Sequence, residues 1–273
     1  MIYDLHIHTT KSDGKYDRYK LLKYFIDNDY KYISFTDHNY ISNIENLNTF
    51  IKDNNSNLIL INGIEFDVSN YKDMHLLGYD IKNIEKVKKE LEKIEKENKE
   101  ICKRLIVNLK NKYGFDISYE ELEERDMQIS KGSIRKILVE KGYAENHLIA
   151  GDLYTGKNSY KYEQTKSLTY EDVIKLIKEN GGIAVLAHPT TLKLDDQSLI
   201  EFIKKLKELG LDGIEVLNAS KTDKRQLELY RNIAKVLDLL ESCGSDFHNE
   251  EYTKTLGIEN EISKKLIYKI KER

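Results

Sequence analysis

The chain has 273 residues, of which 40% are hydrophobic and 33% are charged, and its formal net charge at pH 7 is −3. This composition is typical of a protein with a large core and much exposed helix, and the near balance of charge argues against a protein that coats nucleic acid. The sequence opens without the segments of a signal peptide, and no apolar stretch is long enough to cross a membrane. The two cysteines, Cys102 and Cys243, form no metal or redox motif and are interpreted as buried thiols. We therefore expect a cytoplasmic protein.

Short apolar runs recur along the chain and predict seven buried strands. They cover residues 2–8, 32–38, 58–66, 74–80, 182–189, 213–218 and 239–248. Amphipathic segments between several of these runs predict helices over residues 18–28, 41–53, 170–180, 196–209 and 223–236. Such alternation favours an α/β fold with mostly parallel strands and outer helices, either as a closed or nearly closed barrel or as an open sheet. The third and fourth runs follow each other too closely for a helix between them, so we expect a hairpin or an edge irregularity there.

Residues 83–167 interrupt this alternation and predict a helical insertion. Within it, residues 84–113 form one long charged segment whose apolar side chains recur mostly at spacings of three and four: Ile84, Val87, Leu91, Ile94, Ile101 and Leu105. That stripe fits either a coiled-coil partner or packing onto the helical stretches expected near 118–125 and 131–142. The predicted domains are therefore a discontinuous barrel, residues 1–82 and 168–273, and the insertion, residues 83–167.

Side chains of the kinds that bind metal ions end most of the predicted strands. His6 and His8 are separated by one residue, so on a strand their side chains leave the same face and converge. Other such residues stand in or directly after the remaining runs: Asp13, His38, Glu65, His75, His188, Asp246 and His248. A single histidine is more often a core residue, but six histidines with three carboxylates at one rim of a barrel predict a metal site. The seventh histidine, His147, matches no ligand motif and is interpreted as a surface or packing residue.

The number and kinds of these ligands indicate which ions they suit. Nine ligands exceed the needs of one ion, and at three or four ligands per ion, with one bridging carboxylate, they suit three. A mixed set of imidazoles and carboxylates suits Mn²⁺, Fe²⁺ or Zn²⁺, because no cysteine introduces the preference of thiolates for zinc. We therefore expect three divalent metal ions as cofactors, with their identity left open.

Six stretches around these ligands have the composition and order of a known family: DLHIHTTKSDG (4–14), ISFTDHN (33–39), NGIEFD (62–67), HLLGYD (75–80), GGIAVLAHP (181–189) and GSDFHNE (244–250). In these stretches the chain resembles the polymerase and histidinol phosphatase (PHP) superfamily. Two stretches of the insertion, LVEKGY (138–143) and GKNSYKY (156–162), are similar to the branch of nucleoside 3′,5′-bisphosphate phosphatases and 5′-3′ exoribonucleases. The resemblance implies a distorted (β/α)7 TIM-like barrel with a metal cluster at its mouth.

The resemblance also implies how the ligands divide among the ions. One ion would be held by His6, His8, Glu65 and Asp246. Glu65 would bridge to a second ion held by His75 and His188, and a third would be held by Asp13, His38 and His248. On this basis we expect Glu65, Asp246 and His38 to be catalytic.

The implied reaction is metal-dependent hydrolysis of a phosphomonoester, in a nucleotide such as a nucleoside 3′,5′-bisphosphate or at the 5′ end of short RNA. Clustered divalent ions suit it, because they provide a hydroxide for attack near neutral pH and neutralise phosphoryl oxygens. Histidinol-phosphate phosphatase is the alternative within the superfamily, and a non-catalytic metal-binding or scaffold module is the alternative of another class. The expected partner is a small phosphorylated substrate, with no membrane or protein partner indicated.

The insertion is expected to determine substrate specificity, and its candidate phosphate contacts are Lys131, Arg135 and Lys157. The nucleotide-cleaving branch usually carries an Arg-Pro-His run just before its LVEKGY-like stretch, where this chain has Lys131, Gly132 and Ser133. Lysine attracts phosphate as a point charge but lacks the guanidinium fork. The alternative for each cation is a solvated surface charge.

Several other residues allow two interpretations. Lys221 and Arg225 follow the sixth run on the same rim and are weaker candidates for phosphate contact. Tyr160 and Tyr162 either stack on a base or pack within the insertion. Asp37 either orients an imidazole or caps the helix that follows it.

Overall fold

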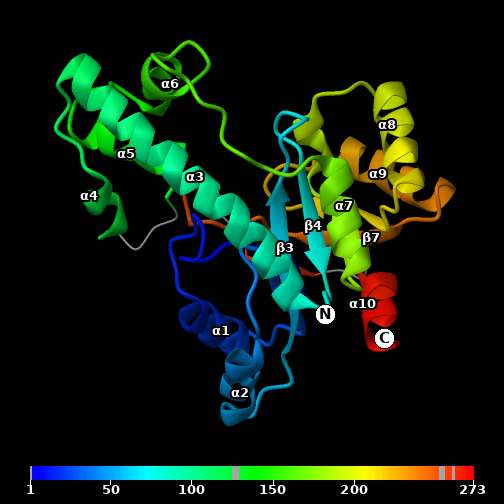
Figure 1. The fold of residues 1–273 in the computed structure, drawn as a ribbon. Helices are drawn as coiled ribbons and strands as arrows, with labels where there is room; N and C mark the ends of the chain where they lie inside the picture. Colours follow the sequence, from blue (N-terminus) through cyan, green and yellow to red (C-terminus); the bar gives the residue numbers. More distant parts are fainter. Residues whose placement is uncertain (1, 125–128, 252–255, 260–261) are drawn as a thin grey trace. The chain divides into compact units, whose positions relative to one another are not determined.

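The computed structural model describes residues 2–124, 129–251, 256–259 and 262–273. The chain divides into two compact units. The barrel unit comprises residues 1–88 and 168–273, and the helical unit comprises residues 89–167. Figure 1 follows the chain through both units.

The barrel unit is built on one sheet with the strand order β7-β6-β5-β4-β3-β2-β1-β8. Its strands are β1 (Ile2–Ile7), β2 (Tyr32–Phe35), β3 (Ile59–Asp67), β4 (His75–Tyr79), β5 (Ile183–Leu186), β6 (Gly213–Asn218), β7 (Leu240–Gly244) and β8 (Ile258–Glu259). The segments after β1 and β7 meet, because the His8 N–H donates to the Phe247 carbonyl at 2.9 Å and the Asp246 N–H donates to the His6 carbonyl at 2.8 Å. The sheet is therefore a nearly closed barrel, which confirms the predicted fold class.

Strand β4 runs antiparallel to both of its neighbours, β3 and β5, whereas the other pairs among β1 to β7 are parallel. A parallel crossover needs about a dozen residues or more, and the connection from β3 to β4 is shorter than that. The hairpin considered for this part of the sequence is thus confirmed. Because β4 runs in the opposite direction, its first residue, His75, pairs with Asp67 at the end of β3. His75 thereby reaches the rim where the parallel strands end.

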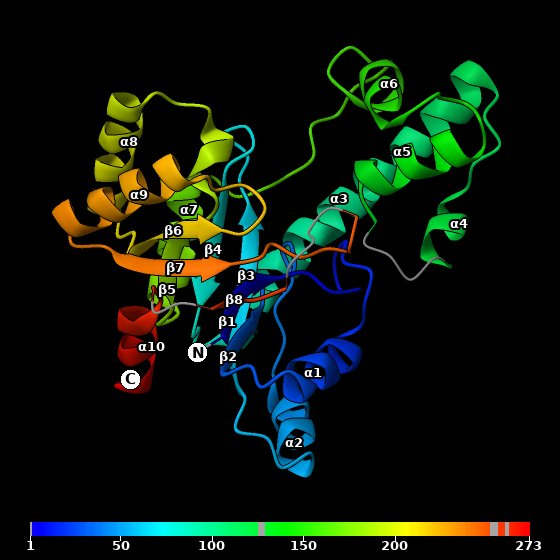
Figure 2. The same cartoon turned by 180° about the vertical axis from the view of Figure 1, so that it is seen from behind.

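The helices of the barrel unit are α1 (Arg18–Asp27), α2 (Glu45–Asp53), α7 (Tyr170–Glu179), α8 (Asp196–Glu208), α9 (Lys224–Val236) and α10 (Lys264–Lys271). Four of them begin at a side chain that accepts hydrogen bonds from the first backbone N–H groups: Asp17, Thr169, Asp195 and Asp223. Figure 2 shows α9 running beside β6 and β7, which it contacts. The helix expected from residue 41 begins only at Glu45. Helix α10 and the two-residue strand β8 were not expected from the sequence, and β8 is too short to show a period.

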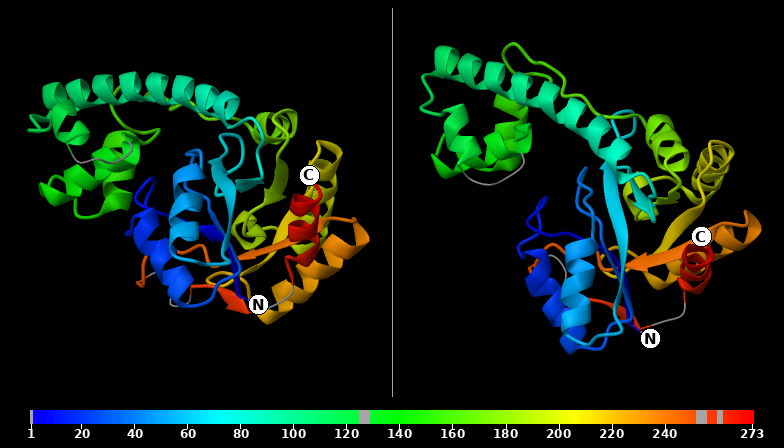
Figure 3. Two further views of the ribbon diagram at one scale, coloured as in Figure 1. Left: turned by 90° about the horizontal axis from the view of Figure 1, so that it is seen from below. Right: turned by 60° about the horizontal axis from the view of Figure 1, so that its bottom comes forward.

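The helical unit contains most of the long helix α3 (Ile84–Tyr113), followed by α4 (Tyr119–Glu123), α5 (Lys131–Glu140) and α6 (His147–Ala150), which continues into a π-helical turn over Gly151–Thr155. Figure 3 shows the shorter helices beside the second half of α3. A buried cluster joins them and includes Cys102, Leu105, Leu122, Ile134 and Leu138. The second half of α3 therefore packs onto the following helices, as the second of the two interpretations of its sequence has it.

Helix α3 is the longest helix in the described part of the chain. Charged side chains fill most positions between its recurring apolar residues. Among the described residues, no helix is both long and apolar enough to cross a membrane.

Candidate metal centre

His6 and His8 lie at the end of β1 and point toward two carboxylates from other parts of the barrel. Their Nε2 atoms are 3.2 and 3.0 Å from the Glu65 Oε2, and 3.4 and 3.3 Å from the Asp246 Oδ1. All four side chains are buried. The convergence expected from the one-residue spacing of the two histidines is therefore present.

Glu65, on β3, lies at the centre of the cluster. Its Oε1 is 2.9 Å from the His75 Nδ1 and 3.0 Å from the His188 Nε2. Its Oε2, besides facing the two histidines of β1, is 3.5 Å from the His38 Nδ1. One carboxylate thus faces five imidazoles, which is the arrangement expected of a bridging ligand.

Asp13 and His248 form the outer side of the cluster. The Asp13 Oδ2 is 3.3 Å from the His248 Nε2 and 3.9 Å from the His38 Nε2, and its Oδ1 is 3.4 Å from the His8 Nδ1. The Asp13 side chain is 56% exposed, whereas His8 is fully buried. The cluster therefore extends from the interior of the barrel to its surface.

The structure brings all nine candidate ligands together, and some of their atoms form three groups with the spacing of a metal site: His6, His8, Glu65 and Asp246; His38, Glu65 and His75; and His8, Asp13, His38 and His248. The first group equals the first set implied by the resemblance. In the second group His38 stands where the resemblance implies His188, and the third contains His8 in addition to the implied residues. Because the two ring nitrogens of His8 and of His38 face different groups, each imidazole lies between two of them.

Unsatisfied polar atoms test whether this cluster fits cations. Of the buried side-chain atoms that make no hydrogen bond within the described residues, four belong to this cluster: His6 Nε2, His8 Nε2, His38 Nδ1 and Glu65 Oε2. Buried polar atoms are nearly always paired, because an unpaired one costs about 1–3 kcal/mol. All four atoms point into the same space, and three are imidazole nitrogens with a lone pair in the neutral ring. The residues therefore fit bound metal ions.

The charges of the cluster reinforce this fit. Burial raises the pKa of Glu65, but His6, His38 and other histidines outweigh it and hold the pKa well below the usual range. For His6, burial lowers the pKa, but Glu65, Asp246 and Glu215 outweigh it and raise the pKa to about 10. The carboxylates thus stay ionised and create a site that favours positive charge.

Glu215, in the middle of β6, contacts the cluster and was not among the residues expected from the sequence. It is fully buried, and its carboxylate accepts hydrogen bonds from the His6 Nδ1 at 3.0 Å and from the His188 backbone N–H at 2.7 Å. A donor at Nδ1 leaves the Nε2 lone pair of His6 directed at the cluster. The one signal in the sequence was a single carboxylate inside the apolar run 213–218.

Asp67 is a second missed residue. Its Oδ1 is 2.9 Å from the His38 Nδ1 and 3.4 Å from the His75 Nε2. It follows Glu65 by two positions, and alternate residues of a strand share a face, so this spacing was a usable signal.

Asp37 takes neither of the two roles considered for it. The next helix begins at Glu45, so Asp37 lies too far before it in the sequence to be its N-cap. Among the described residues, no hydrogen bond joins Asp37 to an imidazole. Its buried carboxylate accepts from the Thr9 N–H at 2.7 Å, from the Ser12 hydroxyl at 2.9 Å and from Arg18 at 3.0 Å. Asp37 therefore fixes the loop that carries Asp13.

In the helical unit, the candidate phosphate contacts differ in their surroundings. The Lys131 ammonium donates to the Glu163 carbonyl and lies 4.0 Å from the centre of the Tyr162 ring. The Arg135 Nε donates to the Thr155 hydroxyl at 2.7 Å. Lys157 is exposed, as is His147 at the start of α6. The roles of these three cations in substrate binding stay predictions.

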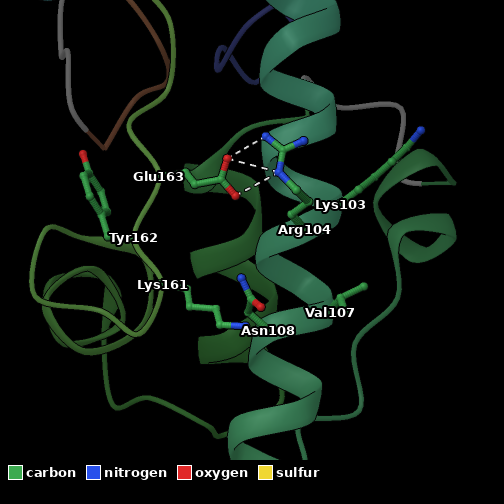
Figure 4. A pocket seen from close by; sticks show the side chains of 7 residues that line it. All are labelled: Lys103, Arg104, Val107, Asn108, Lys161, Tyr162 and Glu163. Atoms are coloured by element: carbon green, nitrogen blue, oxygen red, sulfur yellow. Dashed lines mark hydrogen bonds and ion pairs between the residues drawn. The ribbon is translucent and has the colours of Figure 1, made fainter.

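A groove of the helical unit is lined by Lys103, Arg104, Val107, Asn108, Lys161, Tyr162 and Glu163. Figure 4 shows Arg104 and Glu163 joined across it by a bidentate ion pair, with a shortest distance of 2.6 Å. The Tyr160 side chain is 43% exposed. Two lysine ammonium groups, from Lys112 and Lys161, lie 5.5 and 5.4 Å from the centre of its ring.

The two cations of the loop after β6 have different partners. Lys221 contacts the Asp246 carboxylate directly. Arg225 pairs with Asp196 at 2.6 Å on the surface. Lys221 is therefore part of the cluster, whereas the partner of Arg225 lies outside it.

No family model matches the chain. The chain is 26% identical over 251 residues to a 5′-3′ exoribonuclease of Haemophilus influenzae, covering 90% of this chain and 89% of the relative. It is 27% identical over 251 residues to the 5′-3′ exoribonuclease Rnm of Escherichia coli, covering 91% and 85%.

Similarity to these exoribonucleases extends over about nine tenths of the chain and supports the resemblance to the PHP superfamily.

Solved structures show the same fold. A protein of Bifidobacterium adolescentis described as a metal-dependent phosphoesterase has a TM-score of 0.75 and 24% identity, with 98% of this chain and 94% of that chain covered. An amidohydrolase of Chromobacterium violaceum with bound sulfate and no metal has a TM-score of 0.76 and 21% identity, with 99% and 96% covered. Because the sequence relatives are hydrolytic enzymes matched over about nine tenths of this chain, the protein is assigned to the hydrolytic enzymes.

Proposed function

We propose that this protein hydrolyses phosphoesters at the 5′ end of short RNA. Three divalent ions, of Mn²⁺, Fe²⁺ or Zn²⁺, would serve as its cofactors. The observation that carries the proposal is the presence of three adjoining ligand groups, two of which share the Glu65 carboxylate. The substrate class is supported by the relatives, which are 5′-3′ exoribonucleases matched over about nine tenths of this chain. We predict that the reaction takes place in the cytoplasm.

Within this proposal, nine side chains hold the ions: His6, His8, Asp13, His38, Glu65, His75, His188, Asp246 and His248. Bound divalent cations would neutralise phosphoryl oxygens. They would also lower the pKa of a bound water, so that hydroxide is available near neutral pH. Glu65 and Asp246 act as catalytic residues. Each carboxylate faces two or more imidazoles and would hold an ion together with them. His38 is 18% exposed and lies between Asp13 and Asp67, so it is a ligand at the mouth of the site.

The experiment uses 5′-phosphorylated short RNA and metal-depleted protein. Without added metal we expect no hydrolysis of the RNA or of an aryl phosphate, and with Mn²⁺ we expect release of mononucleotides from the 5′ end. Hydrolysis that persists in excess chelator would refute the metal-dependent mechanism. Glu65→Gln serves as the inactive control.

Other substrates test the alternatives. If a nucleoside 3′,5′-bisphosphate is cleaved much faster than RNA, the protein is a nucleotide phosphatase. If histidinol phosphate is cleaved much faster than RNA, the protein is a histidinol-phosphate phosphatase. A protein that binds Mn²⁺ but cleaves none of these phosphoesters would instead be a metal-binding module.

A further inference from the structure

Asp246 is held through every polar group that it has. Its N–H donates to the His6 carbonyl at 2.8 Å, and its own carbonyl faces the His248 Nδ1 at 2.9 Å. One carboxylate oxygen, Oδ1, is within 3.4 Å of the Nε2 atoms of His6 and His8, whereas Oδ2 contacts the Lys221 ammonium. Its φ of 56° lies in the left-handed region, which costs free energy unless the surroundings hold it. The two oxygens of this carboxylate thus have separate partners.

The loop that carries Lys221 is tied to the same framework. The Lys221 N–H donates to the Asn218 carbonyl at 3.2 Å, and the Ser220 hydroxyl donates to the Ser245 carbonyl at 3.1 Å. The buried Asn218 side chain donates to Glu215 at 3.2 Å, and Glu215 in turn orients a histidine of the cluster. The position of Lys221 is therefore fixed by the shell that holds the ligands.

We propose that Lys221 is a positioning residue of the metal centre. Its ammonium occupies Oδ2 of Asp246, so the carboxylate cannot rotate and presents Oδ1 alone to the space shared with His6 and His8. This inference rests on the metal site under the proposed function and adds a residue that holds one of its ligands.

Two opposing effects of the ammonium make the proposal testable. As a positive charge it repels a metal ion bound nearby, because like charges interact unfavourably at short range. As the partner of Oδ2 it holds the Asp246 carboxylate in one orientation before an ion binds. Metal binding then costs less conformational entropy than it would with a mobile carboxylate. Removing it would strengthen metal binding if repulsion dominated, and would weaken metal binding if positioning dominated. The proposal requires the second result.

The experiment compares Lys221→Met with Lys221→Arg in the full chain. Met keeps the length and much of the apolar stem of lysine, and Arg keeps the charge and the donors. Lys224→Met is the matched control, since Lys224 is an exposed lysine three residues further along the chain. Calorimetric titration with Mn²⁺ in the absence of substrate gives affinity, and elemental analysis after dialysis gives the metal content.

We expect Lys221→Met to bind Mn²⁺ about 10–100-fold more weakly, as is typical when a residue that orients a ligand is lost. Lys221→Arg should restore most of the affinity, and Lys224→Met should match the wild type. Thermal unfolding of the metal-free variants checks that each one folds.

The contrary results are distinct. Unchanged or tighter Mn²⁺ binding by Lys221→Met overturns the proposal, and a raised KM with unchanged metal affinity would assign Lys221 to the substrate phosphate instead. Wild-type protein that binds none of Mn²⁺, Fe²⁺ and Zn²⁺ would refute the metal site itself, and not merely the role of this lysine.

Discussion

His6 and Glu215 are joined by a buried hydrogen bond of 3.0 Å between Nδ1 and Oε1, although 209 positions separate them in the sequence. The same carboxylate accepts from the His188 N–H at 2.7 Å. A residue outside the nine candidate ligands therefore holds two of them. This pair links β6 to the metal centre and suggests where its geometry is most sensitive.

Replacement of Glu215 by Gln should weaken the metal centre without removing a ligand. The amide has a single oxygen, so one of the two donors, His6 Nδ1 or His188 N–H, loses its partner. We expect metal affinity to fall by about 10–100-fold, as measured by calorimetric titration with Mn²⁺. Glu228→Gln, at an exposed position on α9, is the control and should behave as wild type. Equal affinities for the two variants would show that Glu215 does not orient His6.

Replacement of Glu65 by Gln should lower metal content and activity together. The amide keeps the size of the side chain but removes the charge that faces His6, His8 and three further imidazoles. We expect the rate to fall by orders of magnitude, because a metal-centred catalyst is lost. Metal analysis and single-turnover assays on the same sample measure both effects. A variant with full metal content and full rate would contradict the bridging role.

Metal binding should release protons. The carboxylates around His6 raise its pKa to about 10 despite its burial, so metal-free protein carries that proton at pH 7. An imidazole must lose its proton before it binds a metal ion. Titrations with Mn²⁺ at neutral pH, in buffers that differ in ionisation enthalpy, should therefore show net proton release. Binding enthalpies that do not depend on the buffer would contradict this pKa.

The same shift gives metal-free protein a pH dependence of stability with a defined sign. The folded pKa of His6 lies above its ordinary value of 6.5. The stabilisation from its proton is fully present below pH 6.5 and is lost as the pH rises through about 10. The unfolding temperature of chelated protein should fall over that range, as scanning calorimetry can measure. A rise toward pH 10 would contradict the sign.

Gly244→Ala should disrupt the contact between β7 and β1. A Cβ at this position would lie 2.3 Å from the His6 Cβ and 2.6 Å from its backbone nitrogen. We expect a loss of at least about 1–3 kcal/mol in the free energy of unfolding, measured by urea denaturation, with weaker Mn²⁺ binding. Gly132→Ala on α5, where the nearest atom is the Ser130 Oγ at 3.3 Å, is the control and should be neutral or stabilising by up to about 1 kcal/mol. Equal stability of both variants would show that β7 can move away from His6.

The amino-acid sequence by itself determined which residues are candidate ligands and at which ends of strands they stand. This was possible because the signal is local: His6 and His8 alternate on one strand, and most of the other candidates end an apolar run. Burial of both cysteines and the packing of α3 onto its neighbours likewise follow from local apolar patterns, and both are present in the structure.

Only the tertiary structure decided the direction of β4, the roles of Glu215 and Asp67, and the contact between Lys221 and Asp246. The direction of a strand depends on the neighbours it pairs with, and apolar periodicity is the same in both directions. The residues next to a carboxylate in a strand do not predict its partner. The partner comes from a strand that is distant in sequence and becomes adjacent when the barrel closes. For the same reason, His38 and His188 could be assigned to particular ligand groups only once the distances around Glu65 were known.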